Sequence, residues 1–214
     1  MVVCCITGFG SFGSIGTNPT EALVQSLPLE DSHDVTYHTS VIMVSREHVD
    51  AWIRDTFQTL VDACVTREEK IIFIHLGVSE TSTEIALERC AYNECDFRIP
   101  DVSGAQPRHV SISDADELGQ SQETGVPVMA LADSLERSTG RHVRVSDDPG
   151  RYVCNYLYYR SLMEYRDVSR SLEEHDSTGQ RWSLFVHVPK EDCIPLDELK
   201  VIVMSLIQYC LDIV

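Results

Sequence analysis

Short apolar runs alternate with amphipathic stretches along the chain, and this alternation constrains the fold more than any other sequence feature. Residues 2–6 form an apolar run, and residues 70–76 are uncharged after Lys70, as strands covered on both faces are. Strands alternating with helices indicate an α/β sheet with helices on both of its faces. Further strands are predicted over residues 35–44, 142–146 and 181–188.

The stretches between these strands repeat apolar residues at the spacing of one helix face. The run Asn18-Pro19-Thr20-Glu21 predicts the start of the first helix, with Asn18 at the N-cap and Pro19 at the first helical position. Further helices are predicted from about Ser45 and over residues 127–138, 149–164 and 195–213.

Two stretches fit neither pattern. Residues 77–101 show weak alternation, which predicts a hairpin or irregular strands, and the charged residues 164–180 indicate a surface loop or a helix extension. In α/β folds the ligand site lies outside the carboxyl ends of the strands. We therefore expect a site built from four features at those ends: the loop 8–13, the segment 77–93, the turn before Cys154, and His187.

The charge balance restricts the partners. The chain has 214 residues, which predicts one domain over 1–214, and its 34 Asp and Glu against 17 Lys and Arg give a formal charge of −17. Such a surface repels phosphate backbones and anionic lipid, and no cluster of basic residues opposes it. We therefore expect neither nucleic acid nor membrane as a partner; a monomer and a homo-oligomer both remain open.

The first residues and the cysteines indicate a cytoplasmic protein. The apolar run at residues 2–6 has no positive flank and is too short for a signal peptide or a membrane span. Eight cysteines without a signal peptide favour reduced thiols over a disulfide framework. Their spacing contains no CxxC pair, and no HExxH occurs, so we expect no metal site and no cofactor.

The glycine-rich loop 8–13 follows the first strand, as a dinucleotide-binding loop would. Phe12 stands where a phosphate would need a close approach, and the helix begins only at Asn18, too late to direct its amides at a phosphate. A wall for an apolar ligand, built from Phe9 and Phe12, is the better hypothesis. The alternative is a small core cluster beneath a loop.

Cys154 is the best candidate for a nucleophile among the eight cysteines. It follows a predicted strand, a turn and a helix predicted to begin near Pro149, which places the thiol in the first turns of that helix. There the helix dipole favours the thiolate form. The alternative, which is common for a cysteine on a helix, is a buried packing residue.

A nucleophilic cysteine needs a base and a group that orients the base. His187, near the end of a strand and two residues before Pro189, is the best candidate base, and His75 at another strand end competes with it. Glu88 is a carboxylate in an otherwise apolar stretch and is the candidate orienting group. The alternatives are a structural histidine and an ordinary ion pair between Glu88 and Arg89.

At these residues the sequence resembles the pyroglutamyl peptidase I family of cysteine exopeptidases, also called pyrrolidone-carboxylate peptidases. The matching motifs follow one another over nearly the whole chain. They are Thr7-Gly8-Phe9-Gly-Ser-Phe12-Gly with Asn18-Pro19-Thr20, then Ile85-Ala-Leu-Glu88-Arg89-Cys90-Ala91-Tyr92-Asn93 with Arg98-Ile99-Pro100-Asp101, then Ser146-Asp-Asp-Pro149-Gly150-Arg-Tyr152-Val153-Cys154-Asn155, and Phe185-Val-His187-Val188-Pro189.

The resemblance implies a three-layer α/β/α sandwich around a mixed, mostly parallel sheet, as in phosphorylase- and hydrolase-like folds. It implies Cys154 as nucleophile, His187 as general base and then acid, and Glu88 as the group that orients His187. The reaction would release 5-oxoproline from an N-terminal pyroglutamyl peptide through a thioacyl-enzyme. The matched motifs suggest these substrate-binding residues: Phe9, Phe12, Asn18, Val78, Tyr152 and Val153. The Cys154 amide would serve an oxyanion hole, and Arg98 would assist there or support the structure.

The sequence also departs from the family pattern. Pro149, Ala86 and Glu80 stand where the family usually has other residues, and residues 164–180 resemble an insertion. None of these changes removes a member of the triad, so we expect an active peptidase. Two rival hypotheses are a degenerate relative that binds pyroglutamate without turnover and a nucleoside phosphorylase-like enzyme; the absence of a basic phosphate-binding cluster disfavours the second.

Overall fold

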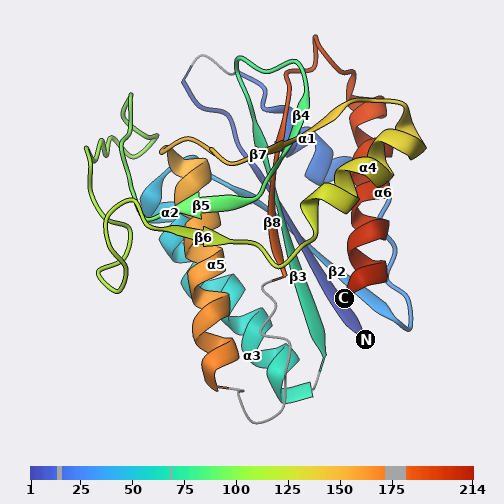
Figure 1. Ribbon diagram of the computed structural model, residues 1–214, viewed down its shortest axis with the longest axis horizontal. Helices are drawn as coiled ribbons and strands as arrows, with labels where there is room; N and C mark the ends of the chain where they lie inside the picture. Colours follow the sequence, from blue (N-terminus) through green and yellow to red (C-terminus); the bar gives the residue numbers. More distant parts are fainter. Residues whose placement is uncertain (14–15, 68, 172–181) are drawn as a thin grey trace.

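The computed structural model describes residues 1–13, 16–67, 69–171 and 182–214. A six-stranded sheet crosses the centre of the molecule, with the strand order β2-β1-β3-β8-β4-β7 (Figure 1). The strands β2, β1, β3 and β8 are parallel, β4 runs antiparallel to β8, and β7 runs parallel to β4. The prediction of a mixed, mostly parallel sheet is confirmed. The strands are β1 (Val2–Phe9), β2 (Val35–Ile42), β3 (Lys70–Val78), β4 (Ile85–Glu88), β7 (Val143–Ser146) and β8 (Ser183–Val188).

Helices cover both faces of this sheet, which completes the three layers (Figure 1). One face packs against α1 (Pro19–Ser26), α4 (Val128–Thr139) and α6 (Leu196–Ile213). The other face packs against α2 (Arg46–Trp52), the π-helical segment η1 (Ile53–Phe57), α3 (Gln58–Arg67) and α5 (Val153–Ser171). A second, two-stranded antiparallel sheet is formed by β5 (Cys90–Tyr92) and β6 (Ser121–Glu123).

The two apolar layers explain why the first and third strands carry so few polar residues. Side chains of a strand point alternately to its two faces. Along β1, Cys4 and Ile6 enter the layer beneath α1 and α6, whereas Val3 and Cys5 enter the layer beneath α2 and α5. Both faces are buried, so both alternating sets must be apolar.

The local helix signals are confirmed at the first two helices. The Asn18 side chain accepts a hydrogen bond from the Thr20 amide, with Pro19 at the first helical position. Ser45 caps α2 by accepting from the His48 amide at 3.2 Å. Both caps satisfy amides that a helix start leaves without an intrahelical partner.

One predicted helix boundary is wrong, and the structure decides between the alternatives at two further segments. Helix α5 begins at Val153, not near Pro149, because Gly150 adopts φ 78° and turns the chain before the helix starts. Of the two alternatives for segment 77–101, irregular strands are confirmed and a hairpin is not, because β4 enters the central sheet and β5 pairs with β6. The segment predicted over 164–180 continues α5 as far as Ser171, and its remainder lies outside the described residues.

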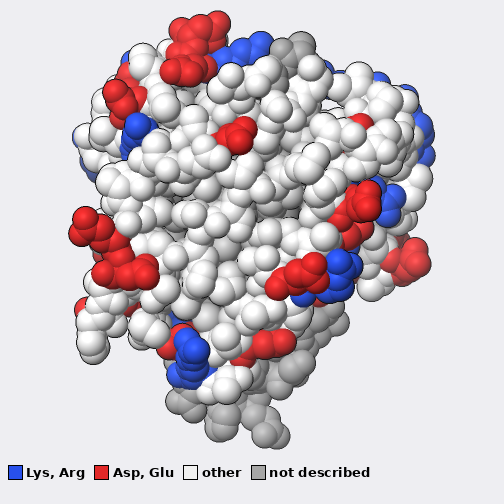
Figure 2. Space-filling view, turned by 180° about the vertical axis from the view of Figure 1, so that it is seen from behind, with Lys and Arg blue, Asp and Glu red and all other residues white. Residues whose placement is uncertain are grey.

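The distribution of surface charge and the length of the apolar helices both concern the possible partners. On the face shown in Figure 2, the Lys and Arg side chains are scattered and mostly lie beside acidic ones. Within the ranges that the structure describes, no helix is both long and apolar enough to cross a membrane.

Candidate active site

Glu88 and His187 come together because β4 runs antiparallel to β8. In this ladder Ala86 lies opposite His187, and Glu88 lies opposite Phe185. Residues two positions apart on a strand share a face, so Glu88 and His187 are diagonal neighbours on one face of the sheet. The small Ala86, one of the departures from the family pattern, therefore faces the imidazole across the ladder.

The two side chains form a buried hydrogen bond. His187 Nδ1 lies 2.7 Å from Glu88 Oε1, and the two side chains are 13% and 2% exposed. Because a carboxylate only accepts hydrogen bonds, Nδ1 carries the proton. A histidine held this way by a carboxylate has its tautomer and its ring orientation fixed, and its Nε2 is left for other chemistry.

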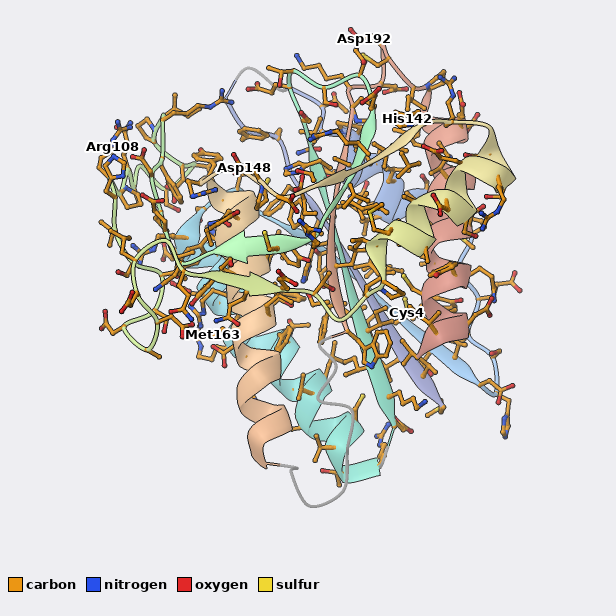
Figure 3. The ribbon with its side chains drawn as sticks, in the orientation of Figure 1. Cys4, Arg108, His142, Asp148, Met163 and Asp192 are labelled. Atoms are coloured by element: carbon orange, nitrogen blue, oxygen red, sulfur yellow. The ribbon has the colours of Figure 1, made fainter. Side chains whose placement is uncertain are left out.

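Cys154 is the second residue of α5 and is partly exposed, unlike the buried thiols of the core. Its side chain lies close enough to His187 to act on the charge of the imidazole. Asp148, labelled in Figure 3, marks the turn just before this helix start, at the carboxyl-end side of the sheet. The thiol, the imidazole and the carboxylate therefore form a connected series.

Gly77 provides the space for this arrangement. It lies opposite His187 in the β3–β8 ladder. A Cβ at this position would lie 2.7 Å from Phe185 Cζ and 3.2 Å from Cys154 Sγ. A glycine within a strand often marks such a close approach, so the isolated Gly77 in an apolar strand is a sequence signal for this part of the site.

The electrostatics favour a charged His187. Burial alone lowers the pKa of this histidine, but hydrogen bonds and charge interactions with Cys154 and Glu88 outweigh burial and raise the pKa to about 9. An imidazolium near neutral pH stabilises a thiolate beside it.

The competing histidine has a different environment. His75 is fully buried, its Nδ1 lies 2.8 Å from Thr7 Oγ1, and its ring packs among Trp52, Phe73 and Phe185. Burial lowers the pKa of His75 to about 3. Its Nε2 has no hydrogen-bond partner among the described residues. It is a neutral core histidine, and the structural alternative holds for it.

The two loop phenylalanines have different surroundings. Phe9 is only 2% exposed and its ring centroid lies 6.5 Å from that of Phe185. Phe12 is partly exposed and lies 6.2 Å from the Tyr152 ring. Asn18 holds the loop, because its Nδ2 donates to the Gly10 carbonyl at 3.0 Å while its oxygen caps α1.

Tyr152 borders the thiol from the residue before α5. Its ring lies 4.7 Å from that of Phe97, and its hydroxyl donates to the Pro100 carbonyl at 3.1 Å. Burial, with smaller effects of Asp101 and Cys154, raises the pKa of Tyr152 to about 12, so it stays protonated. Tyr152 thus joins the helix start to the segment 97–100.

The side chains of Val78 and Val153 are both buried. Val78 ends β3 and, being adjacent to Gly77, directs its side chain to the opposite face of the sheet from the thiol. Val153 is fully buried as the first residue of α5. The first amides of a helix, including that of Cys154, lack intrahelical partners and can donate to an oxyanion.

Arg98 is engaged in an ion pair with Glu80, 2.6 Å between Nη2 and Oε2. Its side chain is 68% exposed, and both charges act on the Tyr152 hydroxyl. The sequence pointed to Arg98 and Glu80 separately but gave no signal that they pair.

The described parts of the chain contain no group of three His, Cys, Asp or Glu side chains arranged to hold a metal ion. The chemistry of the site described here is that of a thiol, an imidazole and a carboxylate.

The chain is similar to known proteins in sequence and in structure. The model of the family described as pyroglutamyl peptidase matches residues 2–205. The pyrrolidone-carboxylate peptidase of Thermococcus litoralis is 29% identical over 86% of this chain and 74% of its own. The human pyroglutamyl-peptidase 1 is 29% identical over 86% of this chain and 77% of its own.

Solved structures agree on the fold. The pyrrolidone carboxyl peptidase from Thermococcus litoralis superposes with a TM-score of 0.78 at 24% identity, covering 99% of this chain and 94% of that one. A mutant pyrrolidone carboxyl peptidase from Pyrococcus furiosus reaches a TM-score of 0.80 at 23% identity, covering 99% of both chains.

Proposed function

Because the chain belongs to the pyroglutamyl peptidase family, we propose that it is a cysteine exopeptidase that hydrolyses the bond after an N-terminal pyroglutamyl residue and releases 5-oxoproline. The observation that carries this proposal is the buried hydrogen bond of 2.7 Å between His187 and Glu88, beside the Cys154 thiol at the start of α5. We treat residues 1–214 as one catalytic domain.

The first half of the reaction forms a thioacyl-enzyme. The Cys154 thiolate attacks the pyroglutamyl carbonyl carbon, and the carbonyl oxygen becomes an oxyanion that the Cys154 amide stabilises. The His187 imidazolium then gives its proton to the leaving amine as the carbon–nitrogen bond breaks. The shortened peptide departs, and pyroglutamate remains bound to sulfur.

The second half reverses the proton's path. Neutral His187 removes a proton from water, and the hydroxide attacks the thioester carbonyl. The carbon–sulfur bond breaks, 5-oxoproline leaves, and the Cys154 thiolate is restored beside a protonated His187. Glu88 touches no reacting atom in this scheme; its carboxylate orients the imidazole and stabilises its positive charge.

A lactam suits the surroundings of this thiol. The pyroglutamyl ring has no charged amine, so Phe12, Tyr152 and an edge of Phe9 can bind its faces without desolvating a charge. The backbone groups of Val78 and Val153 are our candidates for binding the ring N–H and carbonyl. Asn18 contributes by holding the loop, and Arg98, already paired with Glu80, serves as structural support rather than as an oxyanion donor.

The decisive assay measures release of a fluorophore from a pyroglutamyl amide, with and without a thiol alkylator. We expect turnover that the alkylator abolishes, and Cys154→Ser should lower kcat by roughly 10³-fold or more. Cys193→Ser is the matched control, because Cys193 is an exposed thiol; this variant should stay active and stay sensitive to alkylation. A wild-type protein that binds pyroglutamate without turnover would instead be the degenerate relative.

We also propose the cytoplasm as the site of action, since all eight cysteines are free thiols, a state that a reducing compartment maintains. Pyroglutamyl peptides are the proposed partners, and neither nucleic acid nor membrane is among them.

A further inference from the structure

Tyr158 connects the nucleophile's helix to the strand that carries Glu88. It lies four residues after Cys154 on α5, so both side chains lie on the same side of the helix. The side chain is fully buried, and its hydroxyl donates to the backbone carbonyl of Glu88 at 2.9 Å. A buried tyrosine hydroxyl needs a hydrogen-bond partner, and here the bond fixes the distance between α5 and the end of β4.

The Tyr158 hydroxyl lies at the end of the β4–β8 ladder. Glu88 and Phe185 are opposite each other in the β4–β8 ladder. The Phe185 backbone and the Thr124 side chain lie close to the Tyr158 hydroxyl, and the Thr124 hydroxyl itself donates to the Ser183 carbonyl of β8. Tyr158 therefore bonds the backbone of β4 at its last residue and lies against the backbone of β8.

The position of the Glu88 backbone matters because its carboxylate has few restraints. Oε1 accepts from His187, whereas Oε2 has no hydrogen-bond partner within the described residues. A shift of the end of β4 would therefore move the Glu88 carboxylate relative to the His187 imidazole, because no second hydrogen bond from the described residues holds the carboxylate in place.

We propose that Tyr158 is a positioning residue that fixes Glu88, and through it His187, relative to Cys154. The inference rests on the proposed function for its effect on turnover. It closes a ring of contacts: Cys154 to His187, His187 to Glu88, Glu88 to Tyr158, and Tyr158 back to Cys154 through one turn of α5. Such support of a triad acts on kcat rather than on substrate binding.

The test uses Tyr158→Phe, which removes only the hydroxyl. We expect kcat for a pyroglutamyl amide to fall about tenfold, with KM within about twofold, because small misplacements of reacting groups are costly. The pH profile of Cys154 alkylation should also shift, since the Glu88–His187 contact sets the charge of His187. Stability is followed in parallel by urea unfolding.

Tyr159→Phe is the matched control. Tyr159 is the next residue on the same helix and is equally buried, but its hydroxyl bonds Asp116, outside the triad. This variant should lose stability while its kcat and alkylation profile stay those of the wild type. If Tyr158→Phe also keeps the wild-type kcat and alkylation profile, Tyr158 is merely structural and the proposal is overturned.

Two further outcomes of the experiment are also informative. If Tyr158→Phe does not fold, Thr124→Val removes the hydroxyl that lies beside that of Tyr158 and should shift kcat and the alkylation profile in the same direction; wild-type behaviour of that variant overturns the proposal. A wild type that does not cleave the pyroglutamyl amide contradicts the proposed function alone, because alkylation by a small reagent still reports the positioning of Cys154 and His187.

Discussion

His187 donates its Nδ1 proton to Glu88 Oε1 over 2.7 Å, from adjacent antiparallel strands, with both side chains nearly buried. Burial opposes a charge on His187, and Cys154 together with Glu88 overcomes this opposition and raises its pKa to about 9. The charge state of the histidine therefore depends on two neighbours that lie far from it in the sequence.

Replacing Glu88 by Gln removes one of these two supports. We expect kcat to fall roughly 10²- to 10⁴-fold with a smaller change in KM, since the carboxylate acts on the imidazole and not on the substrate. Glu88 raises the pKa of His187, so the variant loses the His187 proton at lower pH and the alkaline limb of the kcat profile, expected near pH 9 in the wild type, moves down. Glu123→Gln, an exposed carboxylate on β6, is the control. An alkaline limb that stays in place would show that Glu88 does not set this pKa.

Gly77→Ala tests the space beneath the thiol. The added Cβ would come within 2.7 Å of the Phe185 ring and 3.2 Å of Cys154 Sγ. We expect a loss of about 1–3 kcal/mol in the free energy of unfolding, as overpacking costs, and a lower rate of Cys154 alkylation. Gly16→Ala, where nothing lies within 4 Å of the new Cβ, should change neither quantity. Equal alkylation rates in all three proteins would contradict the role assigned to Gly77.

His75 makes the fold sensitive to acid. Burial lowers its pKa to about 3, below the ordinary value of 6.5, so the unfolded chain binds a proton in a range where the folded chain does not. This linkage leaves stability untouched above pH 6.5 and lowers it as the pH falls from there towards 3, by at most about 1.4 kcal/mol per pH unit. His75→Gln, although less stable at neutral pH, should show a shallower loss between pH 6 and pH 4 in urea unfolding. The exposed His33→Gln should keep the wild-type slope, and a wild-type slope in His75→Gln would refute the linkage.

The sequence predicted the individual strands better than their order in the sheet. Buried runs such as residues 70–76 indicate strands covered on both faces, and this part of the fold followed directly. The antiparallel insertion of β4 between β8 and β7 depends on pairings that are distant in sequence, and no local pattern in Ile85–Glu88 specifies them. The start of α5 was misplaced because Pro149 suits a first helical position, whereas the positive φ of Gly150 turns the backbone before the helix begins.

Phe12→Ala tests the apolar wall of the proposed lactam pocket. Phe12 is partly exposed beside Tyr152, so its removal should cost little stability while lowering kcat/KM for pyroglutamyl amides about tenfold or more. Alkylation of Cys154 by a small reagent should not change. Phe9→Ala removes a ring that is only 2% exposed and should cost about 3–5 kcal/mol of stability in addition. If both variants keep kcat/KM within about twofold, the loop is structural and binds no ring.

The ion pair between Glu80 and Arg98 should help to hold segment 97–100 against Tyr152. Exposed pairs contribute less than about 1 kcal/mol, so Glu80→Gln and Arg98→Gln should each raise KM by about two- to fivefold and leave kcat unchanged. The exchange of both charges, Glu80→Arg with Arg98→Glu, should restore KM, and added salt should raise KM in the wild type but not in Arg98→Gln. Arg141→Gln, which breaks the exposed Arg141–Glu198 pair, is the control. If Arg98 were an oxyanion donor, Arg98→Gln would instead lower kcat by roughly 10²- to 10³-fold while Glu80→Gln would not.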